Sequence, residues 1–130
     1  MPTSAVLLIV AVTVLMDMII FSSLAAASRA MWRPLAEQFP PRTPAADAVT
    51  KRFQTFRINW FNFGSCIHVA VDATHLHLTP AAFARWFGAR ATSIPWDQIR
   101  IVKSETKWID AKVLGVTLRG PAWCLSLAAK

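Results

Sequence analysis

The chain has 130 residues, of which 55% are hydrophobic, and its 14 Lys and Arg outnumber its 7 Asp and Glu to give a formal net charge of +7. No Gly-rich phosphate loop, nucleophile elbow or HExxH motif occurs, so the sequence predicts a protein that is not an enzyme. A basic charge is compatible with nucleic-acid binding, but no recognised nucleic-acid module is present, and we expect no such partner.

The first predicted element is an apolar run from Ala5 to Leu24 that contains one charge, Asp17. At about 1.5 Å per residue a helix of this length spans roughly 30 Å, the thickness of a bilayer's hydrocarbon core. The alternative is a cleaved signal peptide, with a small-residue cleavage site at 25–28. The absence of a basic residue before the run and the length of the run both favour a retained transmembrane helix within residues 1–28.

The distribution of basic residues predicts the orientation of this helix. Every Lys and Arg follows the run, so the positive-inside rule places the N-terminus in the periplasm and residues 29–130 in the cytoplasm of a bacterial inner membrane. The basic excess after the run serves either solubility or attraction to anionic lipids, and both interpretations stay open. In the cytoplasm, Cys66 and Cys124 are expected to be reduced thiols.

Asp17 is costly inside a bilayer, and the run offers it no Lys, Arg or His as a partner. We therefore expect Asp17 to bond a residue on a neighbouring transmembrane helix; the alternative is that it reaches the interface. Ser22 and Ser23 are small enough to let another helix approach closely. Because the run contains no His, it offers no imidazole ligand for haem or chlorophyll, and we expect no cofactor.

Residues 29–50 are expected to form an interfacial helix and a Pro-rich connector. Trp32 lies between Arg29 and Arg33, a combination that suits the headgroup layer. Pro34 fits the first position of a short helix that ends at Phe39. Three prolines then predict an extended spacer, at positions 40, 41 and 44.

Residues 51–130 are expected to form a small β-domain. Alternation predicts a hairpin in which Asp72 pairs with His75, Val71 with Leu76 and Val69 with Leu78. Residues 81–87 are predicted to form a helical turn or an irregular excursion, with Trp86 and Phe87 as exposed anchors of an interface. The other predicted strands are 53–61, 94–102, 108–113, 115–119 and 123–127, with turns at 62–65 and 120–121.

One face of the predicted hairpin is polar and holds Cys66, His68, Asp72, His75 and His77. The expected register places His68 opposite Thr79 and diagonal to His77, which is close enough for a shared metal ion. The spacing matches no zinc signature, however, and alternation alone collects polar residues on one face. We therefore expect a solvated or partner-facing surface and no metal.

Two motifs carry a resemblance. Residues 32–40 read W-x-x-L-A-x-x-F and residues 93–99 contain I-P-W-x-x-I, a combination that resembles a group of small bacterial membrane-anchored proteins. With the V-D-x-x-x-L-x-L hairpin at 71–78, the second motif is also similar to bacterial PH-like and GRAM-like domains. This resemblance implies a PH-like sandwich or a partly open barrel, because the segment after Pro121 is too short for a long closing helix.

These features together predict a non-catalytic accessory subunit of a larger inner-membrane complex, photosynthetic or respiratory. Its helix would pack against other transmembrane subunits, and its β-domain would cover a cytoplasmic face of the complex. The layout resembles the H subunit of purple-bacterial reaction centres in architecture alone. The alternative is a membrane-anchored PH-like module that binds anionic lipid headgroups or a regulatory ligand. Six tryptophans are many for so small a domain and are expected to fill its core or anchor an interface.

Overall fold

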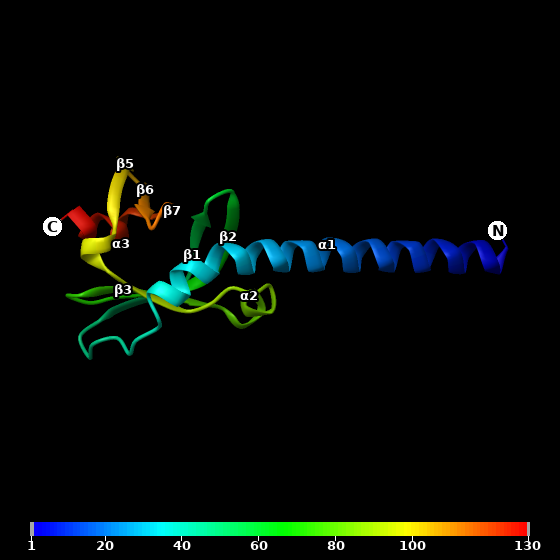
Figure 1. Ribbon diagram of the computed structural model, residues 1–130, viewed down its shortest axis with the longest axis horizontal. Coiled ribbons are helices and arrows are strands. Elements are labelled where there is room, and N and C mark those ends of the chain that lie inside the picture. Colours follow the sequence, from blue (N-terminus) through cyan, green and yellow to red (C-terminus); the bar gives the residue numbers. More distant parts are fainter. Residues whose placement is uncertain (1, 130) are drawn as a thin grey trace.

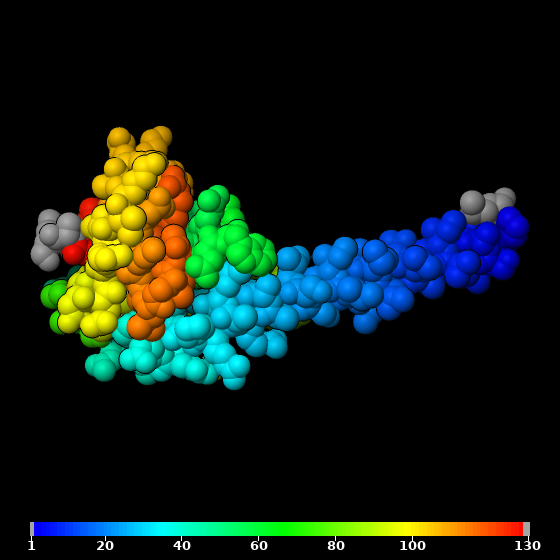
Figure 2. Space-filling model, turned by 45° about the horizontal axis from the view of Figure 1, so that its top comes forward, coloured from blue at the N-terminus to red at the C-terminus, as the bar shows by residue number. Residues whose placement is uncertain are grey.

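The computed structural model describes residues 2–129 and contains one long helix that projects from a curled β-domain (Figure 1). Helix α1 (Thr3–Gln38) is the one helix of the described residues that is long and apolar enough to span a membrane. Its N-terminal part stands free of the rest of the chain (Figure 2). The architecture is therefore an apolar N-terminal helix joined to a mainly β-domain, as the sequence predicts.

The helix is longer than expected. We expected the spanning helix to end by residue 28 and a second helix to begin at Pro34, but α1 continues without a break to Gln38 and contains Pro34 in its interior. A proline there removes one backbone hydrogen bond. The loss is offset because Trp32 and Leu35, on either side of it, are fully buried against the β-domain.

Seven antiparallel strands form one sheet in the order β4-β3-β2-β1-β7-β6-β5, so β1 is central and β4 and β5 are the two edges. The sheet curls around a core that α1 helps to cover (Figure 1). The strands are β1 (Val49–Ile58), β2 (Phe61–Val71), β3 (His75–Pro80), β4 (Thr92–Pro95), β5 (Arg100–Ser104), β6 (Trp108–Val113) and β7 (Val116–Pro121).

The predicted hairpin is confirmed in its register. Strands β2 and β3 pair Val69 with Leu78 and Val71 with Leu76. The Asp72 N–H donates to the His75 carbonyl at 3.2 Å and closes the turn. Alternation defined this register because a slip of one residue would turn every apolar side chain away from the core.

Other predicted boundaries are wrong. The β1–β2 turn lies at residues 59–60 rather than 62–65, because Asn59 adopts a φ of 53°, which Asn tolerates better than most residues. The strand expected at 94–102 is split between the two edges of the sheet, with a 3₁₀ turn (Trp96–Gln98) following β4. Gly120 was expected in a turn but lies within β7. A Cβ at this position would come within 2.4 Å of the Phe56 ring.

The C-terminal segment is helical instead of the expected strand at 123–127. Helix α3 (Ala122–Leu125) continues into a 3₁₀ turn, η2 (Ser126–Ala129). Cys124 and Leu125 are fully buried in the core, which favours a helix that plugs the curled sheet. A further short helix, α2 (Ala82–Trp86), connects β3 to β4 and lies beside α1 (Figure 1).

Candidate functional site

The first candidate site is a shallow groove on the free part of α1. Asp17 lines this groove together with Val14, Met18, Phe21 and Ser22. Its carboxylate is exposed on the helix surface, and no side chain among residues 2–129 forms an ion pair or hydrogen bond with it. The groove therefore presents one acid, flanked by apolar side chains and a small hydroxyl, to whatever surrounds the helix.

The two serines of the run differ in their positions. Ser22 lines the groove with Asp17. Ser23 lies outside it, and its hydroxyl donates to the Ile19 carbonyl at 2.8 Å within the same helix. Only Ser22 is therefore placed beside Asp17, and the prediction that both serines face a partner helix stays untested.

The three residues expected at the headgroup layer differ in exposure. Arg29 and Arg33 are exposed, and Arg33 Nε donates to Glu37 Oε1 at 3.0 Å. Trp32 is instead fully buried and packs edge-to-face on Phe63, with ring centroids 5.4 Å apart. The prediction that Trp32 contacts headgroups is thus wrong, because the unbroken helix turns its ring into the core of the β-domain.

Helix α2 fastens the β-domain to the end of the apolar run. The Phe87 ring lies 4.5 Å from that of Phe21. Gly88 lies against Ala25 and Arg29, so closely that a Cβ would be 2.8 Å from the Arg29 Cβ. Trp86 is exposed, as we expected of an interface anchor, whereas Phe87 is half-buried. This is the place where the domain and the free helix meet.

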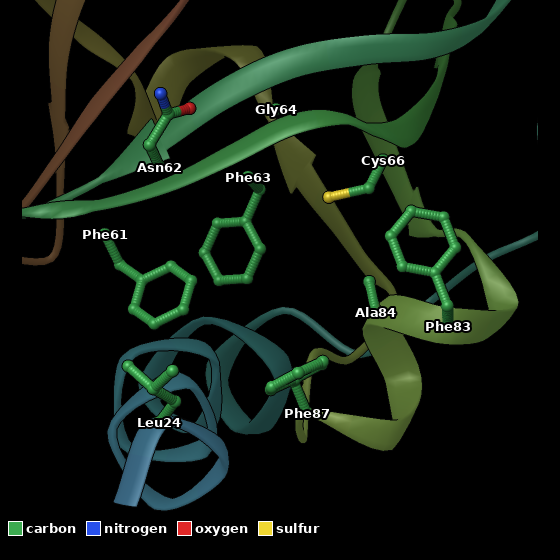
Figure 3. A pocket seen from close by; sticks show the side chains of 9 residues that line it. All are labelled: Leu24, Phe61, Asn62, Phe63, Gly64, Cys66, Phe83, Ala84 and Phe87. Atoms are coloured by element: carbon green, nitrogen blue, oxygen red, sulfur yellow. The ribbon is translucent and has the colours of Figure 1, made fainter. Parts of the chain in front are cut away.

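An apolar cavity of about 260 Å³ lies at this junction (Figure 3). Its walls come from α1, β2 and the α2 segment, and Figure 3 shows four phenylalanine rings around it, those of Phe61, Phe63, Phe83 and Phe87. The residues that line it include Leu24, Phe61, Phe63, Cys66, Phe83 and Phe87. The lining is mostly apolar, with Asn62 as its polar side chain, and suits hydrocarbon better than a polar ligand.

The second candidate site is a buried polar cluster on the predicted hairpin. His77 Nε2 lies 2.7 Å from Asp72 Oδ2, and His77 Nδ1 lies 2.7 Å from Ser93 Oγ. An ionised carboxylate only accepts hydrogen bonds, so Nε2 carries a proton. The Arg42 N–H donates to Ser93 Oγ at 2.7 Å. The cluster therefore joins the hairpin, the edge strand β4 and the connector after α1.

Hydrogen bonds determine the charge state of Asp72. Burial raises the pKa of this carboxyl, but four hydrogen bonds lower it, so the pKa lies well below its ordinary value of 3.8. The donors are the His77 ring and the N–H groups of Ala45, Thr74 and His75, at 2.7 to 3.1 Å. Asp72 is consequently ionised, and its carboxylate holds the connector, the hairpin turn and the His77 ring by hydrogen bonds.

Ser93, His77 and Asp72 are the residue types of a hydrolase triad. Their hydrogen bonds, however, tie the connector to the sheet. Ser93 is 3% exposed, and its oxygen is already engaged by the connector. A nucleophile must reach its substrate, and this hydroxyl is covered. The arrangement holds the connector on the sheet.

We expected the polar hairpin face to be solvated or to face a partner; it is not solvated throughout, and a partner stays untested. Cys66 and His77 are buried, and His68 accepts a hydrogen bond from the Phe53 N–H at 3.2 Å. Within residues 2–129, no three His, Cys, Asp or Glu side chains are placed to hold a metal ion. Cys66 and Cys124 are not joined in a disulfide, and burial raises the pKa of both thiols, that of Cys124 to about 12.

Sequence reasoning missed Ser93 and Arg42 as members of this cluster. They lie far along the chain from Asp72, and only the pairing of β3 with β4 brings Ser93 opposite His77. Comparisons with protein-family models, with curated proteins and with solved structures found no match to this chain.

Proposed function

We propose that the chain is a non-catalytic accessory subunit of a larger bacterial inner-membrane complex of the photosynthetic or respiratory kind. Helix α1 crosses the bilayer and packs against other transmembrane subunits. The β-domain, a partly open barrel of the PH-like kind, lies in the cytoplasm and covers a face of the complex. The N-terminus is in the periplasm because all basic residues follow the apolar run.

The exposed carboxylate of Asp17 carries this proposal. Acidic side chains within a span are expensive in lipid and usually face protein, water or a basic partner. In this chain Asp17 lines an open groove with Ser22, and nothing within residues 2–129 bonds it. A neighbouring helix that supplies a hydrogen-bond donor or a positive charge would remove that cost.

The continuity of α1 supports an assembly role as well. The helix enters the β-domain without a linker, and Ala25, Trp32 and Leu35 are buried there. A partner helix bound at Asp17 would consequently have a fixed orientation relative to the β-domain. Such coupling suits a structural subunit, which orients one part of a complex against another.

The buried polar cluster supports the absence of catalysis. Its serine is covered by the connector, and both thiols have a raised pKa, which leaves them weak nucleophiles at neutral pH. The serine and the two thiols of the domain therefore have a structural role.

Co-purification from native membranes tests the proposal. The tagged full-length chain is extracted in several mild detergents, and the extract is resolved on a blue-native gel and identified by mass spectrometry. We expect the wild-type chain to migrate with integral membrane proteins. Asp17→Ala should release it, whereas Asp17→Asn, which keeps a polar group in the groove, should retain part of the complex.

Ser23→Ala is the matched control, because this serine is in the same span but bonds its own helix outside the groove. It should leave the complex intact. Migration of the wild-type chain as a free 14.4 kDa monomer in every detergent contradicts the proposal.

A further inference from the structure

The six tryptophans of the chain are unequally exposed. Trp60 and Trp86 are 68% and 79% exposed, while Trp32 is buried and the other three are half-buried. Both exposed rings lie next to the point where α1 leaves the domain: Trp86 ends α2, and Trp60 lies in the β1–β2 turn. Tryptophan is enriched where a membrane meets water, because its ring is apolar and its N–H is polar.

The contacts of α2 fix its depth relative to the apolar run. Phe87 packs on Phe21, which lies three residues before Leu24 and thus about 4.5 Å inside the end of the run at 1.5 Å per residue. Gly88 packs on Arg29, which lies five residues after Leu24 and thus about 7.5 Å outside it. If α1 spans the bilayer, α2 lies across the boundary between hydrocarbon and headgroups.

Trp60 lies on the opposite side of α1, beside residues 27–34, which are about 4.5 to 15 Å outside the end of the run. It borders a shallow hollow together with Ala27, Ala30 and Pro34. Ala30 follows Phe21 by nine residues, about two and a half turns at 3.6 residues per turn, so the two face opposite ways. The β1–β2 turn and α2 therefore flank the helix on either side (Figure 1).

The charges around α2 suit an anionic partner. Arg85 and Arg90 are exposed, and residues 73–96 contain no Asp or Glu. No salt bridge among the described residues involves Arg29, Arg85 or Arg90, whereas Arg33 is paired with Glu37. Exposed Phe83 lies on α2 with Arg85, and the apolar cavity opens beside it. Aromatic and basic side chains together match the boundary of a bilayer that contains anionic lipids.

We propose that α2 and the β1–β2 turn form a second membrane contact, which seats the β-domain on the bilayer that α1 crosses. Phe83, Trp86 and Trp60 enter the interfacial layer, and Arg85 and Arg90 bind the phosphates of anionic phospholipids. This contact needs no other protein subunit. It rests on α1 spanning a membrane, and it is independent of the proposed accessory role.

Quenching of tryptophan emission by brominated lipid tests the contact. The full-length chain is reconstituted alone into vesicles of phosphatidylcholine and phosphatidylglycerol whose acyl chains are brominated close to the headgroup. We expect bromine to quench part of the emission. Trp86→Phe and Trp60→Phe should each lower the quenched fraction, while Trp123→Phe should raise it because Trp123 belongs to α3, at the end of the domain opposite the free part of α1 (Figure 1).

An unchanged quenched fraction in both Trp86→Phe and Trp60→Phe would overturn the contact. Far-UV circular dichroism checks that each variant is folded, and a variant that fails this check is replaced by Trp→Leu at the same position. Because no partner is present in these vesicles, failure of the lipid contact is distinguishable from failure of the proposed assembly.

The role of the arginines is tested by comparing vesicles with and without phosphatidylglycerol. The wild-type chain should be quenched more strongly when the anionic lipid is present. The double variant Arg85→Gln/Arg90→Gln should lose this difference, and Arg52→Gln/Lys107→Gln, which removes the same charge elsewhere on the domain, should keep it. Equal quenching of the wild-type chain in both lipids overturns the assignment of the arginines.

Discussion

Asp72 is the residue on which separate segments of the chain converge. Its carboxylate accepts hydrogen bonds from the connector at Ala45 and from His77 on β3, and its backbone carbonyl accepts one from Trp96 Nε1 at 2.8 Å. Loss of the carboxylate would leave the buried His77 ring and the Ala45 N–H without this acceptor, whereas the Trp96 bond to the backbone carbonyl would remain. Removal of one partner from such a group typically costs about 1–3 kcal/mol.

We therefore expect Asp72→Asn to lower the free energy of unfolding at neutral pH by about 1–3 kcal/mol. The pH dependence follows from the lowered pKa of Asp72. Below an ordinary pKa of 3.8 the unfolded state binds a proton that the folded state does not, so the stabilisation is complete above this pH and is lost as the pH falls through the folded-state value. Melting temperatures measured from pH 7 to pH 2 should fall less steeply in Asp72→Asn than in the wild-type chain.

Asp47→Asn is the control for this measurement, because Asp47 is exposed and lies in the connector near the same cluster. Its melting temperatures should follow the wild-type curve. Parallel curves for Asp72→Asn and the wild-type chain would show that Asp72 is not the group that titrates.

At the scale of elements, the junction of α1 with α2 depends on Gly88. Gly88 and Gly115 both have a positive φ, of 85° and 76°. A Cβ on Gly88 would lie 2.8 Å from the Arg29 Cβ and 3.1 Å from the Ala25 carbonyl oxygen, whereas nothing lies within 4 Å of one on Gly115. The two glycines share the backbone requirement and differ in packing alone.

Gly115→Ala should therefore cost about 1–2 kcal/mol, the penalty of a left-handed residue with a Cβ. Gly88→Ala should cost about 1–3 kcal/mol more, because α2 must move away from α1. Thermal unfolding of the full chain in micelles, followed by near-UV circular dichroism, compares the two variants. Equal melting temperatures would mean that α2 is not packed on the helix as described.

Elements that depend on local patterns were predictable from the sequence, and those that depend on distant packing were not. Alternation sufficed for the hairpin of β2 and β3, where one register alone buries the apolar side chains. Pro34 suggested a helix boundary, but burial of Trp32 and Leu35 outweighed that local signal. The Asp17 groove was foreseeable from the cost of a charge in lipid, whereas Ser93 joins the Asp72 cluster only through strand pairing.

At the scale of the whole molecule, the Asp17 groove and α2 lie on the same side of α1. Phe21 lines the groove with Asp17 and also packs on Phe87 after α2. A partner helix in the groove would consequently stand directly over α2. Trp60 borders Ala27 and Ala30 on the opposite side of the helix and would remain uncovered.

The assembled complex should therefore protect one exposed tryptophan and leave the other in lipid. In the chain reconstituted alone, brominated lipid should quench both Trp86 and Trp60. In the complex, cysteines placed at these positions and treated with a lipid-soluble maleimide should react unequally: Trp86→Cys slowly and Trp60→Cys at the rate found for the isolated chain. Cys66 and Cys124 are buried, and the chain without added cysteines measures the background reaction of these two thiols with the maleimide. Equal protection of both positions would place the partner elsewhere than the Asp17 groove, because a helix in that groove reaches α2 and cannot reach the β1–β2 turn.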